Sequence, residues 1–238
     1  TRVRMVSAIV VNVMYVFSEM ALPPATVAGY TDEKHYDDAT GQFVISPTKV
    51  ELDLAPGESA TRDITVANRT GTTLTIEFSV EDFEGSSDPS QATVFLGDED
   101  SSWGARRWLE PEIASMVLNQ GETLTVRTKV NVPKNAEPGG RYAALFASST
   151  YESQDEQGSP VNITSRVETL FLIKVAGTII NEGTLNKPEV PGLSEYGPID
   201  VGLVFNNTGN VHLKPQGRVL STNFLGQQVA DIPAPEWV

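Results

Sequence analysis

The sequence predicts an all-β protein whose main domain is an antiparallel β-sandwich, and three observations carry this prediction. In TLTIEFSVEDF (residues 73–83) and TLTVRTKVNV (residues 123–132), apolar and polar residues alternate, as in strands with one buried face. No stretch after residue 42 keeps the i, i+3, i+4, i+7 spacing of a long amphipathic helix. Short strand-like segments between glycine and proline turns are typical of an immunoglobulin-like sandwich, here slightly larger than the usual ~100 residues.

The individual strands follow from the same alternation. We expect them at 43–54, 60–68, 73–83, 91–96, 113–118, 122–132, 140–150 and 162–178. VETLFLIKVAG (residues 167–177) is apolar on both faces, which predicts a central strand. Two similar corners, LDLAPGESATRDITV and MVLNQGETLTVRTKV, each run from an apolar strand through a Gly-Glu turn into an alternating strand. Pro56 and Gly57 are therefore assigned a structural role in the first corner.

Five segments are expected along the chain. Residues 1–28 carry two arginines, a short apolar run and then small residues, which is the layout of a secretory signal peptide; a buried amphipathic helix is the alternative. Polar residues 29–42 predict a linker, and 43–180 the sandwich. The Pro/Gly-rich stretch 181–198 predicts a second linker. Residues 199–238 are expected to begin a second immunoglobulin-like β domain, because about forty residues are too few to complete one.

Composition excludes several classes of function. The 238 residues include 31 Asp and Glu against 17 Lys and Arg, a net charge of −14, which argues against binding to nucleic acid or to an anionic membrane surface. Membrane contact is expected only through the N-terminal segment or a C-terminal anchor outside this sequence. With no cysteine there is no disulfide or thiolate site, and two histidines, His35 and His212, are too few for a histidine zinc site. Neither histidine lies near a nucleophile motif, and no carboxylate pair stands out for glycoside hydrolysis, so we predict that the protein is not an enzyme.

The loop GDEDSSWGARRW (residues 97–108) holds the candidate metal ligands. Asp98, Glu99 and Asp100 offer three carboxylates, which suit calcium, although the string lacks the EF-hand glycine. The alternative interpretation is that Arg106 and Arg107 neutralise these acids. No other cofactor is expected.

The same loop supplies candidate contact residues for a partner. Trp103, between Ser and Gly, is expected to be exposed, and exposed tryptophan is common at binding hot spots and can stack on sugars. Arg106, in the same loop, and Tyr151, which is expected to open a polar loop, are the other candidates. Trp108 is expected to pack into the core, as a tryptophan often does in such sandwiches.

The stretch VPKNAEPGGRYAALFASS (residues 132–149) allows two interpretations. Adjacent glycines beside an arginine can form a phosphate-binding loop, but such a loop opens a helix. Here β-type residues follow, so Pro138, Gly139 and Gly140 are predicted to form the turn that starts a strand. In that strand Tyr142 or Phe146 is expected to fill the core. The small residues Ala143, Ala144 and Ala147 are expected to pack against the opposite sheet.

Residues 43–178 resemble the peptidoglycan-binding domain of bacterial WxL-interacting surface proteins. The shared features are an early proline after an apolar pair (FVISP), the L-x-P-G corner, V-x-N-x-T at a strand end, and the V-P-x-x-A-x-P-G-G-x-Y-x-A step. The segment NNTGNVHLKPQGRVLSTNFLGQQVA resembles the immunoglobulin-like domain that follows in such proteins.

The resemblance implies an exported, non-enzymatic protein of the bacterial cell envelope or cell surface. Its implied partners are cell-wall peptidoglycan, other surface proteins or host matrix, the last as an adhesin. Two alternatives stay open. One is a periplasmic assembly chaperone whose immunoglobulin-like domain donates a strand to a pilus subunit. The other is an accessory module of a glycan-active enzyme.

Overall fold

The protein folds into two compact units, one of residues 31–179 and one that joins residues 1–30 to residues 180–238. The structure, a computed structural model, describes residues 2–5, 10–11, 42–86, 93–154, 160–186, 199–214, 216–223 and 225–233. Over these ranges the ordered elements are strands, apart from one short 3-10 helix, η1 (Arg106–Trp108). None of the ranges contains a helix long and apolar enough to cross a membrane.

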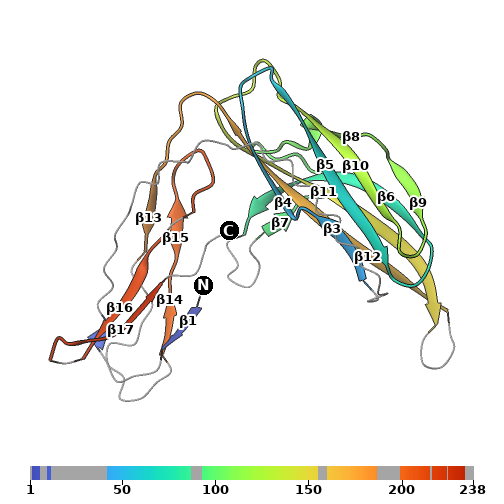
Figure 1. The fold of residues 1–238 in the computed structure, drawn as a ribbon. Helices are drawn as coiled ribbons and strands as arrows, with labels where there is room; N and C mark the ends of the chain where they lie inside the picture. The colour runs from blue at the N-terminus through green and yellow to red at the C-terminus, as the bar shows by residue number, and fades with distance from the viewer. Residues whose placement is uncertain are drawn as a thin grey trace. The chain divides into compact units, whose positions relative to one another are not determined.

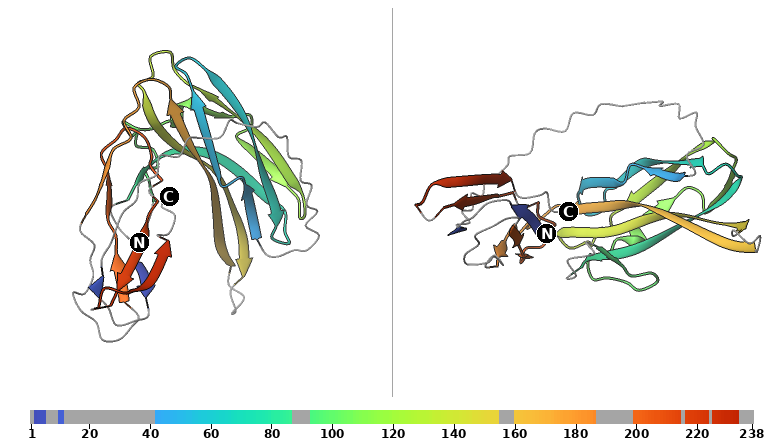
Figure 2. Two further views of the ribbon diagram at one scale, coloured as in Figure 1. Left: turned by 60° about the vertical axis from the view of Figure 1, so that its left-hand side comes forward. Right: turned by 90° about the horizontal axis from the view of Figure 1, so that it is seen from below.

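The unit of residues 31–179 is a sandwich of two sheets, so the predicted fold class is confirmed (Figures 1 and 2). The four-stranded sheet has the order β3 (Gln42–Ser46), β5 (Ser59–Arg69), β10 (Thr123–Asn131), β8 (Leu109–Pro111). The six-stranded sheet has the order β4 (Lys49–Leu54), β12 (Pro160–Val175), β11 (Gly139–Gln154), β6 (Leu74–Gly85), and both β7 (Thr93–Phe95) and β9 (Ser115–Leu118) pair with β6. Neither β8 nor η1 was expected from the sequence.

The core of the sandwich is built from the alternating apolar residues of both sheets. Ile64, Val66 and Val130 of one sheet, and Leu145 and Phe171 of the other, are fully buried in one cluster. Each such side chain contributes about 1.5–3 kcal/mol relative to an exposed one. The predicted central strand is confirmed, because β12 lies between β4 and β11.

The segment 43–54 is not the single strand that the alternation predicts. The chain forms β3, turns at Pro47 and Thr48, and continues as β4 in the other sheet. β3 pairs antiparallel with residues 65–69 of β5, and β4 pairs parallel with residues 170–175 of β12. Pro47 has no N–H to continue a ladder, which is consistent with the change of sheet at this point. This first segment therefore covers only half of the edge of each sheet.

The two predicted Gly-Glu corners have the same geometry. Gly57 (φ +83°) and Gly121 (φ +76°) occupy the left-handed region, which favours glycine. The carboxylate of the following glutamate accepts from the backbone N–H three residues back, Glu58 from Ala55 and Glu122 from Asn119, each at 2.8 Å. Both corners carry the chain from the six-stranded sheet to the four-stranded one.

The Pro138-Gly139-Gly140 step is a strand entry, as predicted. Gly139 (φ +127°) is the first residue of β11 and pairs with Val175. A side chain on Gly140 would clash with the phenol of Tyr142, which lies over this position. The strand is longer than expected, since β11 and β12 pair from Gly139 to Gln154 and from Pro160 to Val175. Tyr151 therefore does not open a loop: it lies within β11, in register with Ile163.

Two details of the prediction for β11 were wrong. Ala143 and Ala147 lie in the main core as expected, but Ala144 and Phe146 face the other side of the six-stranded sheet. There they form a small second cluster with Phe83, against which Tyr142 packs. The period of a strand requires this, because successive side chains point to opposite faces.

The second unit contains seven described strands. They are β1 (Arg2–Met5), β2 (Val10–Val11), β13 (Gly183–Leu185), β14 (Ile199–Gly202), β15 (Phe205–Asn207), β16 (Arg218–Thr222) and β17 (Gln228–Pro233). β13 arises inside the expected linker 181–198, so the β structure of this unit starts earlier than predicted. β1 pairs with β14 and β2 pairs with β16, although the sequence suggests a leader segment or a helix there. The predicted boundary at residue 28 lies outside the described residues.

Each of the two units contains the same kind of asparagine turn. The amide of Asn68 donates to the carbonyl of Thr72 (2.7 Å) while its side-chain oxygen accepts from the N–H of Thr70 (3.0 Å). Asn207 makes the equivalent bonds four and two residues ahead, to Val211 (2.7 Å) and Gly209 (3.0 Å). Each asparagine closes the turn at the end of its strand by replacing backbone partners.

Candidate functional site

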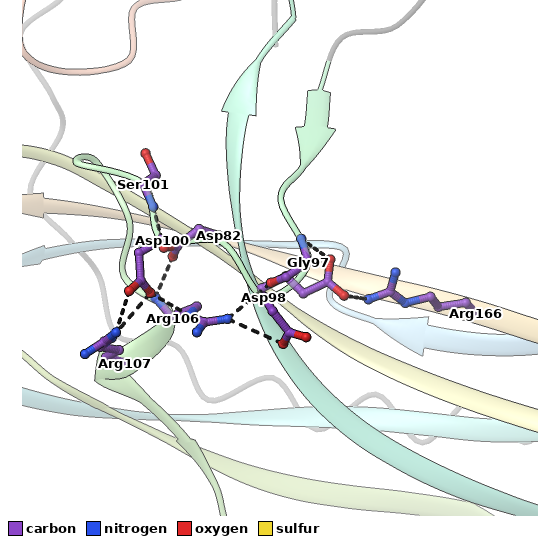
Figure 3. Close-up of polar contacts among 9 residues, drawn as sticks. Asp82, Gly97, Asp98, Asp100, Ser101, Arg106, Arg107 and Arg166 are labelled. Atoms are coloured by element: carbon purple, nitrogen blue, oxygen red, sulfur yellow. Dashed lines mark hydrogen bonds and ion pairs between the residues drawn. The ribbon is translucent and has the colours of Figure 1, made fainter.

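Two features of the sandwich unit are candidates for function: the loop of residues 97–108 and the edge of β12. Acidic side chains of β6 bind the loop and hold it in place. Asp82 is 2% exposed, and its carboxylate accepts from the N–H groups of Ser101 (3.1 Å), Ala105 (2.9 Å) and Arg106 (2.7 Å) (Figure 3). A buried carboxylate with three donors is satisfied, and it fixes the path of the loop.

Gly104 permits this arrangement. A Cβ atom at residue 104 would collide with the carboxylate of Asp82. The loop also pairs with the start of β11, because the N–H of Tyr142 donates to the carbonyl of Trp103 (2.8 Å) and the N–H of Ala105 donates to the carbonyl of Tyr142 (3.1 Å). Residues 103–105 thus take the place beside β11 that β6 leaves after Asp82.

The arginines of the loop neutralise its acids. The Nε of Arg106 donates to Asp100 at 2.8 Å, and Arg107 also binds the Asp100 carboxylate (Figure 3). The hydrogen bond from the Arg107 guanidinium, together with Arg106, holds the pKa of Asp100 below its ordinary value of 3.8, although desolvation acts in the opposite direction. The side chain of Asp98 is fully exposed, 3.9 Å from Arg106.

The expected calcium site is not assembled. Over the described ranges, which include residues 97–108, no group of three Asp, Glu or His side chains is arranged to hold a metal ion. Asp98, Glu99 and Asp100 do not converge, and Asp100 is occupied by two guanidinium groups. The alternative interpretation, neutralisation by Arg106 and Arg107, describes the geometry.

The predicted contact residues differ in their exposure and in their partners in the structure. Trp103 is 43% exposed, as expected, and the guanidinium carbon of Arg141 lies 5.3 Å from its ring centroid. Arg106 is a structural residue of the loop, bound to Asp100 and to the carbonyl of Gly97 (3.2 Å). Trp108 is half-buried and packs against the main core, which agrees with its predicted role. The side chain of Tyr151 lies outside the described residues.

A hollow of about 190 Å³ lies beside the loop. Its lining is polar apart from one ring and consists of Asp82, Asp100, Ser101, Gly104, Arg106, Arg107 and Trp108. Because Asp82, Asp100, Arg106 and Arg107 already bind one another or the loop backbone, the hollow is a consequence of the loop architecture.

The edge of β12 is the second candidate, and sequence reasoning missed it. β4 covers this edge only from Leu170 to Val175, and no strand in the described part of the chain pairs with residues 160–169 on that side. The N–H of Leu170 donates to Thr48 and that of Ala176 to Leu54, so even-numbered residues point toward this edge. Backbone groups alternate in direction along a strand, so Thr164, Arg166 and Glu168 direct their N–H and C=O groups to the uncovered side.

Among the described strands, β5 has an equivalent uncovered half-edge at residues 59–64, because β3 covers only residues 65–69. Here the edge is blocked by charge. The guanidinium of Arg62 donates to the carbonyl of Thr61 at 2.8 Å, and Glu58, Arg62 and Asp63 are exposed. Natural sheets protect open edges in this way. On β12 the one arginine, Arg166, is drawn away from the edge to Glu81 and over the ring of Phe146.

Comparisons with known proteins concern the fold. No family model matches the chain, and no curated protein matches it. Among solved structures, a chain of a chaperone–tip adhesin complex of CFA/I fimbriae has a TM-score of 0.45 at 10% identity, covering 81% of this chain and 78% of that one. The class 5 fimbriae chaperone CfaA gives 0.40 at 10% identity, with 83% and 99% covered.

A third similar structure is a domain of a human protein. The ASH/PapD-like domain of human CEP192 gives a TM-score of 0.38 at 12% identity, with 66% of this chain and 99% of that chain covered. The resemblance to WxL-interacting proteins stays a prediction.

Proposed function

We propose that the protein is a non-enzymatic, exported envelope protein that captures an extended segment of a partner protein along the uncovered half of β12. The observation that carries the proposal is the contrast between the two half-edges. The half-edge of β5 is blocked by Arg62 and its charged neighbours, whereas the longer one on β12 is not paired with any strand in the described part of the chain. A strand that adds to such an edge gains main-chain hydrogen bonds along its length.

The side chains beside the edge indicate which kind of partner segment could pair with β12. Val167 is half-buried and packs against the main core, on the face toward the other sheet. Thr164, Arg166 and Glu168 lie on the opposite face by the period of the strand. A partner segment with apolar residues at alternate positions would extend the core with one face and leave polar side chains on the other. This proposal is closer to the assembly-chaperone alternative than to adhesion or cell-wall binding.

The proposal is tested by proline substitution at an outward-facing residue. Thr164→Pro removes an N–H from the uncovered edge, but none of the N–H groups that bond to β11. The probe is a fluorescently labelled nine-residue peptide of alternating valine and threonine, measured by anisotropy against the full chain. We expect Thr164→Pro to weaken binding at least tenfold, because proline removes a donor and crowds the edge.

Thr61→Pro, on the blocked half-edge of β5, is the matched control and is expected to leave the affinity unchanged. Both variants are compared by thermal unfolding, so that a loss of binding can be separated from a loss of fold. Equal affinity of the wild-type protein and Thr164→Pro would sink the proposal.

A further inference from the structure

The indole of Trp103 is exposed on a segment that is otherwise fixed. The carbonyl of Trp103 accepts from Tyr142 at 2.8 Å, and its N–H donates to the hydroxyl of Ser101 at 3.1 Å. The next residues are bound to the buried carboxylate of Asp82. Even so, Trp103 is 43% exposed. An aromatic side chain held on a rigid backbone can bind a partner with little loss of conformational entropy.

One face of this ring already carries a cation. The guanidinium carbon of Arg141 lies 5.3 Å from the ring centroid, and the Arg141 side chain is only 7% exposed. It donates to the carbonyl of Gly140 at 2.8 Å and lies 3.7 Å from the carboxylate of Glu137. The ring thus accepts a guanidinium in the folded protein, and Glu137 offsets the charge that would otherwise repel a second cation.

The charges around the loop favour a cationic ligand on the exposed side. The guanidinium groups of Arg106 and Arg107 are bound to Asp100, and that of Arg166 is bound to Glu81. Asp98 and Glu99 remain exposed, and the whole chain carries a net charge of −14. Asp98 lies 3.9 Å from Arg106, and the loop of residues 97–108 carries three carboxylates against two guanidinium groups, an excess that attracts lysine and arginine and repels anions.

We propose that Trp103 is a contact site for a lysine or arginine side chain of a partner protein, which stacks on the exposed part of the indole while the excess of carboxylates on the loop of residues 97–108 supplies the complementary charge. This site is built by the loop of residues 97–108 and does not use the edge of β12, so it goes beyond the proposed strand capture. The partner surface it fits is basic.

The test uses a labelled heptapeptide of alternating glycine and lysine, and its glutamine counterpart, with the full chain at low salt. We expect the lysine peptide to bind more tightly than the glutamine peptide. Trp103→Ala should weaken the lysine peptide about fivefold and Trp103→Phe about twofold, because tryptophan is the strongest cation–π acceptor. Met116→Ala is the matched control, since Met116 is 44% exposed in the same unit, and it should change nothing.

Equal affinity for the two peptides would overturn this inference, as would a lysine-peptide affinity unchanged by Trp103→Ala in a protein that still unfolds cooperatively. The double variant Asp98→Asn/Glu99→Gln should weaken binding and make it less sensitive to salt. Thr164→Pro separates this site from the proposed function, because it should leave the lysine peptide unaffected. If instead it abolishes lysine-peptide binding, the peptide is held at β12 and the inference fails.

Discussion

A single buried carboxylate organises the loop that carries the exposed tryptophan. Asp82 accepts three backbone N–H groups from residues that are 19 to 24 positions away in the sequence. Each of these bonds joins a charged acceptor to a neutral donor, so each is stronger than a bond between neutral groups. The loop is therefore positioned from within the sheet rather than by its own turns.

Gly104→Ala tests this arrangement. The added methyl group would collide with the Asp82 carboxylate, so either the loop or the carboxylate must move. We expect the free energy of unfolding to fall by about 1–3 kcal/mol, as measured by urea denaturation. Gly85→Ala is the control, because a Cβ there meets nothing within 4 Å. Equal stability of Gly104→Ala and Gly85→Ala would contradict the role given to Asp82.

The pH dependence of the loop depends on Asp100. Its pKa lies below 3.8 in the folded protein, first because Arg107 donates to it. The ion pair therefore contributes its full stabilisation above pH 3.8 and loses it as the pH falls through the lower folded value. In a carboxyl-detected NMR titration, the midpoint of Asp100 should lie below 3.8 and move back toward 3.8 in Arg107→Gln. A midpoint at or above 3.8 in the wild-type protein would refute this assignment.

At the scale of residues, the sequence indicates the buried carboxylate of β6 but not its partners. The alternation that places Leu74, Ile76 and Val80 on one face continues to Asp82, so a buried carboxylate could have been expected there. The partners of that carboxylate could not, because they come from a loop whose path depends on tertiary contacts. The calcium hypothesis had the same weakness: three adjacent acids say nothing about where their side chains point.

At the scale of the elements, local rules predicted most strands and both Gly-Glu corners. The strands and corners depend on the alternation of side chains along a strand and on glycine at positive φ. Both are determined by residues that are neighbours in the sequence. The change of sheet between β3 and β4 is different, because alternation alone cannot show which sheet a strand joins. For the same reason the uncovered half of β12 was missed, although its residues were correctly placed in a strand.

The hairpin of β11 and β12 is paired over a greater length than the contact of β11 with its other neighbour, β6. β6 pairs with β11 only at residues 143–148, whereas the hairpin pairs with itself for sixteen residues on each strand. Figure 1 shows its paired ends extending past the neighbouring strands of the sandwich. The alternation predicted β11 only as far as residue 150, because the polar residues after Ser149 look like a loop, whereas the second strand was predicted at nearly its observed length. The uncovered edge of β12 arises because β4 pairs only with residues 170–175 of this long strand.

At the scale of the whole molecule, the two proposed sites would recognise a protein partner in different ways. The proposed strand capture at the edge of β12 would depend on backbone hydrogen bonds and a suitable apolar pattern. The proposed Trp103 site would depend on charge. The second unit repeats the asparagine turn of the first.

The central claim is that one half of β12 is free to pair, and residue-resolved amide hydrogen exchange tests it most directly. In the free protein the amides of Thr164, Arg166 and Glu168 should exchange quickly, while those of Ser165, Val167 and Thr169, which face β11, should be protected. The valine–threonine peptide should slow the first set and leave the second unchanged. Even-numbered amides as protected as the odd-numbered ones in the free protein, or unaffected by the peptide, would contradict the account.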